Sequence, residues 1–252
     1  DDVLHRLGVI IDDARRDGSR LGYFAALYRN VTAEVQRGIA AGRFADGARM
    51  ARLDVVFANR YLDAYDAYAA GRPASRCWVA AFEAASRWPP LILQHLLLGM
   101  NAHIHLDLGI AAAEVAAGAE LGALEGDFVA INALLREMID DVQHRIAAVS
   151  PWMWIVDRIG LRGDETICGL CIGGAREVAW RVATRLAPLD AAGRAAEIAR
   201  LDAMVAALAI PVAHPGLLAR TALLGVRLRE ARDVGKVISA LDARTPATLA
   251  PA

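Results

Sequence analysis

The segment that decides the fold runs from Trp88 to Leu106, WPPLILQHLLLGMNAHIHL, and is the longest stretch of the chain without a formal charge. Two prolines open it, and proline is favoured in the first turn of a helix. The stretch contains a glutamine, an asparagine and three histidines, which are costly in lipid. We therefore expect a buried helix from Pro89 to about Ala117, and no membrane span, at the centre of a helical protein.

Outward from this segment, apolar residues recur at helical spacing, and glycine or proline separates the periodic stretches. No convincing alternating strand pattern is present, the connections are short, and no repeat is apparent. We therefore expect an all-α fold, a single-domain irregular bundle of about nine to eleven helices over residues 1–245, followed by a loose tail at 246–252. The predicted helices span about residues 2–16, 32–42, 46–70, 74–87, 89–117, 127–149, 152–159, 164–187, 190–208, 215–230 and 232–242.

The composition limits the class of protein. Apolar residues make up 56% of the chain and charged residues 23%, which suits a folded protein with a sizeable core. The net charge is −1 without a basic block, so binding to nucleic acid or to an anionic membrane is not expected. The N-terminus shows no basic region followed by an apolar stretch, so we expect a cytoplasmic protein.

Several catalytic motifs are missing. Lys236 is the only lysine, which argues against Schiff-base chemistry and a phosphate-binding P-loop. None of the five serines lies in a G-x-S-x-G elbow. Cys168 and Cys171 form a C-x-x-C spacing, but without a second such pair we interpret them, with Cys77, as small core residues.

Polar residues inside the central apolar helix mark the candidate site, because an unpaired buried polar group costs about 1–3 kcal/mol. Helical spacing predicts two polar stripes, one formed by His95, Gly99, His103 and Asp107, and the other by Gln94, Asn101 and His105. His103 and Asp107 are four residues apart, which suits two ligands of one metal or an acid–base pair. Gly99 would leave space for a ligand or another backbone. The same residues could also form a hydrogen-bonded core network.

A second group of candidates lies in the predicted helix over residues 46–70. Asp54 and Tyr61 share one face, and Asp54 is flanked by apolar residues. A buried carboxylate needs a partner, a metal or a raised pKa. We expect Asp54 or Tyr61 to reach a cavity lined by the stripe of His95, His103 and Asp107. We also expect burial of the set Asp54, Asn101, His103 and Asn132, with at least two of them close together.

The motifs Leu53-Asp54-x-x-Phe57-Ala-x-Arg60-Tyr61-Leu62, Gln94-His95-Leu-Leu-Leu-Gly-Met-Asn101-Ala-His103-Ile-x-Leu-Asp107-Leu-Gly, Asp127-Phe-x-x-Ile-Asn132 and Ala175-Arg176-x-x-Ala-Trp180 resemble an uncharacterised bacterial family of unknown function. The resemblance covers most of the chain, implies an all-helical fold and transfers no activity. A weaker likeness links the H-x-x-x-D spacing to zinc-dependent phospholipase C and S1-type nucleases, which are all-helical hydrolases. This chain lacks their N-terminal Trp and has fewer histidines.

Three functions follow from these residues. The first is a metal-dependent hydrolase of a hydrophobic small molecule, with zinc, iron or manganese held by His95, His103 and Asp107, and possible help from Asp54. The second is a metal-free cyclase, isomerase or lyase. In it His103 moves the proton, Asp107 orients His103, and Tyr61 or Asn101 binds a carbonyl. The third is a non-catalytic small-molecule binder or structural bundle.

Overall fold

The computed structural model describes residues 2–116, 120–151 and 172–243. Every regular element among these residues is helical, which confirms the all-α prediction. The predicted helix at 152–159, the pair Cys168 and Cys171, and the tail at 246–252 lie outside the described residues. The elements are α1 (Asp2–Asp17), α2 (Gly22–Ala40), α3 (Gly47–Ala69), α4 (Arg76–Ser86), α5 (Ile92–Ala102), η1 (His103–Asp107), α6 (Leu108–Val115), α7 (Glu120–Val149), α9 (Ile172–Leu186), α10 (Ala191–Ala213), α11 (Leu217–Arg227) and α12 (Val234–Asp242).

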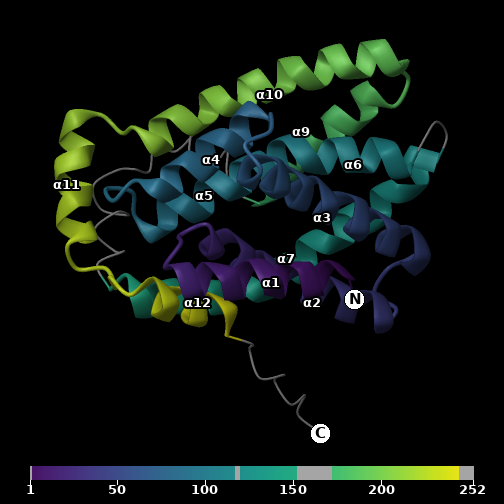
Figure 1. The fold of residues 1–252 in the computed structure, drawn as a ribbon. Coiled ribbons are helices and arrows are strands. Elements are labelled where there is room, and N and C mark those ends of the chain that lie inside the picture. Colours follow the sequence, from purple (N-terminus) through teal and green to yellow (C-terminus); the bar gives the residue numbers. More distant parts are fainter. Residues whose placement is uncertain (1, 117–119, 152–171, 244–252) are drawn as a thin grey trace, which may run out of the picture.

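The continuous segment formed by α5, η1 and α6 passes through the middle of the molecule (Figure 1). It packs against α2, α3, α4, α9 and α10. The long helix α10 covers it on one side, and α1, α2, α7 and α12 lie on the other. Ile92–Val115 is long and apolar enough to cross a membrane, but 83% of its most apolar stretch is buried inside the protein. It is packed as a core segment.

Three helices end where a glycine was expected to end them. Gly18, Gly42 and Gly71 follow α1, α2 and α3, and each has a positive φ of 62–69°. Glycine adopts this left-handed conformation without the steric cost that a Cβ brings. At the other end of α3, the Asp46 side chain accepts a hydrogen bond from the Arg49 backbone N–H at 2.9 Å, as an N-cap should.

Other helix boundaries differ from the prediction. Thr32, which was predicted to start the second helix as its N-cap, is buried within α2, because α2 begins ten residues earlier at Gly22 without a side-chain cap. Helix α7 begins at Glu120, before Asp127. Helix α10 continues through Pro211 to Ala213. In these cases tertiary packing extends a helix beyond its local sequence signals.

A π-helical turn interrupts the central segment at His103–Asp107. Such a turn places one extra residue into an α-helix, and it is often found at functional sites. It therefore changes which residues share a face on its two sides. Both of the polar residues with the strongest functional prediction, His103 and Asp107, lie within this turn.

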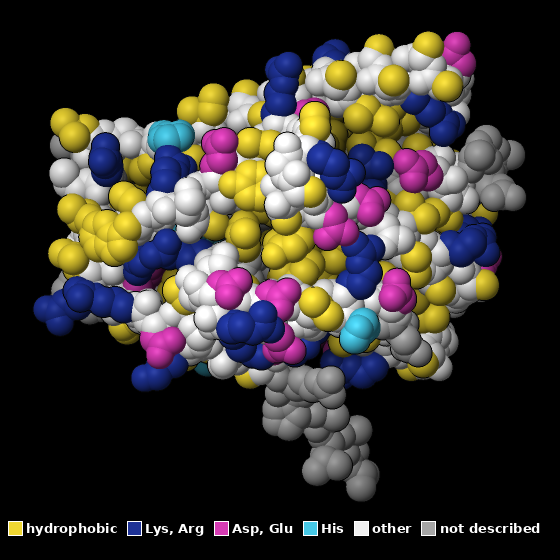
Figure 2. Space-filling view, viewed as in Figure 1, with side chains coloured by type: hydrophobic (Ala, Val, Ile, Leu, Met, Phe, Trp, Pro, Cys, Tyr) yellow, Lys and Arg dark blue, Asp and Glu magenta, His cyan; other side chains and the backbone are white. Residues whose placement is uncertain are grey.

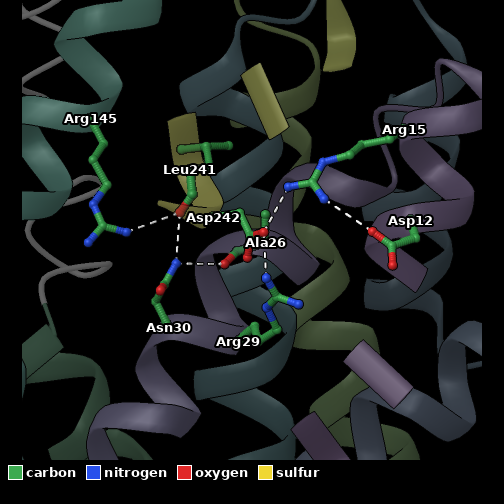
Figure 3. A network of polar contacts seen from close by, with 8 residues as sticks. All are labelled: Asp12, Arg15, Ala26, Arg29, Asn30, Arg145, Leu241 and Asp242. Carbon is green, nitrogen blue, oxygen red and sulfur yellow. Dashed lines mark hydrogen bonds and ion pairs between the residues drawn. The ribbon is translucent and has the colours of Figure 1, made fainter. Parts of the chain in front are cut away.

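The C-terminal helix α12 is tied to the first two helices by the carboxylate of Asp242 (Figure 3). Arg15 of α1 pairs with this carboxylate at 2.8 Å, and Arg29 of α2 pairs with the same oxygen. Asn30 donates a hydrogen bond to the backbone oxygen of Leu241 at 2.9 Å. These contacts fix α12 beside α1 and α2.

Acidic and basic side chains are interspersed on the face shown in Figure 2. Apolar side chains are visible along α10 at the upper edge of the same view. Met204, Leu208 and Ile210 of this helix are each about half exposed or more. The packed interior instead lies around the central segment, on the inner side of α10.

Candidate functional site

Asp107 is the centre of a buried polar cluster. Its carboxylate accepts three hydrogen bonds: from Arg60 Nε to Oδ1 at 3.1 Å, from Trp78 Nε1 to Oδ2 at 2.8 Å and from His103 Nδ1 to Oδ2 at 3.2 Å. These donors come from α3, α4 and the start of η1. An ionised carboxylate can only accept, so the proton of the neutral imidazole is on Nδ1. Asp107 thereby fixes both the orientation and the tautomer of His103.

His103 is enclosed by aromatic rings. The ring of Phe57 stacks on the imidazole with centroids 3.6 Å apart, and the ring of Tyr28 meets it edge-on at 4.5 Å. Burial lowers the pKa of His103, although the hydrogen bond from its Nδ1 to Asp107 acts in the opposite direction. The imidazole is therefore neutral at physiological pH. Its Nε2 is buried and has no hydrogen-bond partner among the described residues.

A cavity of about 290 Å³ adjoins His103 and is lined by residues of α2, α3, α5 and α7. Its wall is almost entirely apolar; α5 contributes Leu93, Leu97 and Met100, and α7 contributes Leu135, Met138 and Ile139. Gln143 also lines the cavity and is exposed, so the cavity reaches the surface near this residue. The volume is at the lower end of the range for small-molecule sites, about 300–1,000 Å³.

Few polar side chains interrupt this apolar wall. They are Tyr28, Asp54, His103, Gln143 and Arg176. Burial raises the pKa of Asp54 to about 7, although a hydrogen bond with Gln36 acts in the opposite direction. The cavity wall therefore contains one carboxyl group that titrates near neutral pH, Asp54, and one neutral imidazole, His103. The expected burial of Asp54, Asn101 and His103 is confirmed, whereas Asn132 is only partly buried.

The structure does not place His95 with His103 and Asp107. The imidazole of His95 packs edge-on against Tyr23 of α2, with centroids 5.6 Å apart, and it does not line the cavity. The physical reason is helical geometry. Four residues exceed one turn by about 40°, so His95 and His103 already point about 80° apart. Burial and the nearby positive charge of Arg20 lower the pKa of His95 to about 3.

The space that was expected beside Gly99 is filled. A Cβ at Gly99 would lie 2.4 Å from the ring of Phe24, so the glycine admits this aromatic side chain instead of a ligand. The Phe24 ring in turn contacts His103 edge-on, with centroids 5.8 Å apart. Gly99 thus allows α2 to approach α5 closely enough to enclose the imidazole.

The remaining predicted residues lie around the site but outside the cavity wall. Tyr61 is fully buried beside Phe24, Trp78 and His103, and does not line the cavity. Asn101 donates to the backbone oxygen of Val205 at 2.9 Å and so links α5 to α10.

The two other polar residues of the expected second stripe are buried as well. Gln94 accepts from the Leu91 backbone N–H at 2.8 Å and donates to the backbone oxygen of Val212. His105 is buried, and it is not among the residues that line the cavity.

Three important residues were missed by sequence reasoning. Trp78 and Arg60 hold the carboxylate of Asp107, and Arg176 lines the cavity. Arg60 and Arg176 both stand within the motifs that carry the family resemblance, so the signal was present without a role attached to it. Trp78 donates its indole N–H to a residue 29 positions further along the chain, and this partner could not be read from the sequence.

The site lies in a part of the chain that matches a known protein family. The model of a family of unknown function, DUF5995, matches residues 1–215. The chain belongs to this family. No curated protein and no solved structure matches the chain. The described residues that line the cavity and those that surround Asp107 all fall within the DUF5995 region, whereas α11 and α12 lie beyond it.

In this DUF5995 protein, the predicted ligands His95, His103 and Asp107 are not arranged to hold a metal ion. Among the described residues, no group of three or more His, Cys, Asp or Glu side chains is arranged to hold a metal ion. Asp107 already pairs with the cation of Arg60 and accepts the Trp78 N–H, so its oxygens have partners. His95 points toward Tyr23 and contributes no third ligand. A metal would have to displace these contacts.

Proposed function

We propose that this DUF5995 protein binds an apolar small molecule in the cavity and transfers protons to and from it through His103. The observation that carries the proposal is the buried His103–Asp107 pair beside an apolar cavity. A neutral imidazole oriented by a carboxylate is the usual arrangement of a general base. The reaction class is a metal-free isomerisation, cyclisation or elimination, in which one proton leaves a carbon or oxygen of the ligand.

Each residue of the site has its own role in the proposed proton transfer. His103 Nε2 takes the proton, while Asp107 accepts the hydrogen bond from Nδ1–H and stabilises the imidazolium that forms. Arg60 and Trp78 hold Asp107 in place. Asp54 supplies or receives a second proton, since burial raises its pKa to about 7. Two titratable groups in one apolar cavity suit an isomerase, which removes a proton from one atom and returns it to another.

A second function, binding without catalysis, is favoured by the enclosure of the imidazole. Phe57 covers one face of His103, Tyr28 meets it edge-on, and Nε2 is buried. If these rings stay in place when a ligand enters, His103 would shape the cavity wall without touching a reacting atom. The two functions differ in whether a proton is transferred, which can be measured directly.

The test uses exchange of hydrogen for deuterium at carbon. The protein is incubated with 2-octanone, an apolar ketone, in D₂O, and loss of the protons next to the carbonyl is followed by NMR. We expect the protein to accelerate this exchange, and His103→Gln to reduce the acceleration about a hundredfold or more. His144→Gln, at an exposed histidine of α7, is the matched control and should leave the exchange unchanged.

The result also separates the two functions. Saturable binding of 2-octanone without protein-catalysed exchange would overturn the acid–base proposal in favour of the binder. Absence of binding, with this ketone and with other apolar ligands, would remove both.

A further inference from the structure

Arg176 is a buried cation in the wall of the apolar cavity. It lies on α9 and is 5% exposed. Its Nη2 donates to the backbone oxygen of Phe128 at 3.2 Å, and its guanidinium carbon lies 4.6 Å from the centre of the Phe128 ring. Its Nε is buried without a hydrogen-bond partner. Among the residues that the structure describes, no carboxylate forms an ion pair with Arg176.

A second arginine of the chain shows how unusual this is. Arg227 is buried to the same extent, and it pairs with Glu230 and donates to the backbone oxygen of Trp88. In the network of Figure 3, Arg15 and Arg29 likewise converge on the carboxylate of Asp242. Arginine is almost never fully buried unless it is paired, because an unpaired buried charge is costly.

Burial lowers the pKa of Arg176 to about 10, so the guanidinium remains charged at neutral pH. Its contacts with Phe128 offset part of the cost of burial but, in the part of the chain that the structure describes, leave no anion beside it. An anion that enters the cavity would supply the partner that Arg176 lacks among the described residues.

We propose that the cavity takes an apolar carboxylic acid, whose carboxylate pairs with Arg176 and whose hydrocarbon part lies along the apolar wall. The inference rests on the proposed function, because it specifies the ligand of the same cavity. The planar guanidinium can donate two parallel N–H bonds to a carboxylate, which gives both affinity and orientation. The apolar side chains of α5 and α7, such as Leu97 and Met138, would cover the hydrocarbon chain.

The test compares octanoate with 1-octanol, which share a hydrocarbon chain and differ in the charged group. Binding to the whole protein is measured by isothermal titration calorimetry. We expect the wild type to bind octanoate at least about tenfold more tightly than 1-octanol, because an ion pair in an apolar site adds at least that factor. This comparison needs no variant and tests the charge directly.

Two variants then assign the charge to one residue. Arg176→Met should weaken octanoate binding at least about tenfold and leave 1-octanol binding equal or stronger. Arg176→Lys should keep part of the preference for octanoate, because it keeps the cation but not the planar fork. Arg181→Met, at an exposed arginine of the same helix, is the matched control and should change neither affinity.

The outcomes distinguish this inference from the proposed function. If 1-octanol binds as tightly as octanoate, or if Arg176→Met keeps the preference for octanoate, the carboxylate inference is wrong while the cavity remains a binding site. If the wild type binds neither compound nor 2-octanone, the proposed function fails and the inference fails with it.

Discussion

The ring of Phe57 lies face to face with the imidazole of His103, with centroids 3.6 Å apart and planes 8° from parallel. Phe57 is also one turn along α3 from Asp54, and all three residues line the same cavity. The stacking holds the ring while Asp107 fixes its rotation through Nδ1. One aromatic side chain on α3 therefore positions the group that we propose as the base.

Asp107→Asn should destabilise the protein strongly. The amide removes the negative charge that Arg60 contacts, and it brings N–H donors toward N–H donors already directed at Asp107. Breaking a buried ion pair by removing one partner costs about 3–5 kcal/mol, and Arg60 is partly exposed, so the lower end applies. Urea unfolding measures the loss. Asp66→Asn, which removes an exposed pair with Arg6, should cost less than about 1 kcal/mol.

Gly99→Ala should cost about 1–3 kcal/mol, because the new methyl group would lie 2.4 Å from the Phe24 ring and overpack the core. Gly122→Ala on α7 is the control. Apart from the backbone of its own helix and its chain neighbours, nothing lies within 4 Å of its added Cβ, so alanine should stabilise the helix by up to about 1 kcal/mol. Thermal unfolding measures the change in melting temperature for both variants. If the two changes were equal, the Phe24 ring would be able to move aside without cost, and the prediction would be wrong.

His95→Met should protect the protein against acid. The pKa of His95 is about 3 in the folded protein against 6.5 ordinarily, so below pH 6.5 the unfolded chain binds a proton that the folded protein does not. Stability is therefore lost as pH falls from 6.5 toward 3, by up to about 5 kcal/mol. Met is apolar and of similar size. Denaturant unfolding at pH 7 and pH 4.5 measures the free energy of unfolding. Relative to the wild type, the variant should be more stable at pH 4.5 than it is at pH 7.

Asp54→Asn should show the opposite pH dependence. The pKa of Asp54 is about 7 in the folded protein against 3.8 ordinarily, so between these values the folded protein holds a proton that the unfolded chain has released. Wild-type stability attributable to this group is complete below pH 3.8 and declines through pH 7, by up to about 4 kcal/mol. As the pH rises from 5 to 8, the free energy of unfolding of the variant, measured by denaturant unfolding, should increase relative to that of the wild type. A constant difference across this range would show that Asp54 ionises normally.

Much of the fold was predictable because its signals are local. Helix ends at Gly18, Gly42 and Gly71 follow from glycine's freedom at positive φ, and the burial of Asp54 and His103 follows from their apolar neighbours. The start of α2 was missed because its N-cap residue, Leu21, makes no side-chain capping hydrogen bond, and burial against the core stabilises the helix instead.

The candidate site was only partly predictable because its contacts connect distant parts of the chain. The His103–Asp107 pair follows from a four-residue spacing, but the donors to Asp107 come from α3 and α4. The neighbour of Gly99 comes from α2 and the cavity wall from α7. The prediction for His95 was wrong because each interval of four residues exceeds a helical turn by about 40°. Residues spaced in this way from His95 to Asp107 therefore do not share one face of the helix.

The π-turn at His103–Asp107 makes the length of this segment critical. Deleting one residue within it would restore a regular α-helix and rotate α6 by about 100° relative to α5. Gly109 faces α9 so closely that an added Cβ would lie 2.7 Å from the backbone oxygen of Ala179. The rotation would move Gly109 away from α9 and place a residue with a larger side chain against α9. A one-residue deletion in this buried segment would therefore require compensating changes in α6 and α9 at once, whereas a substitution on the surface of the protein would not.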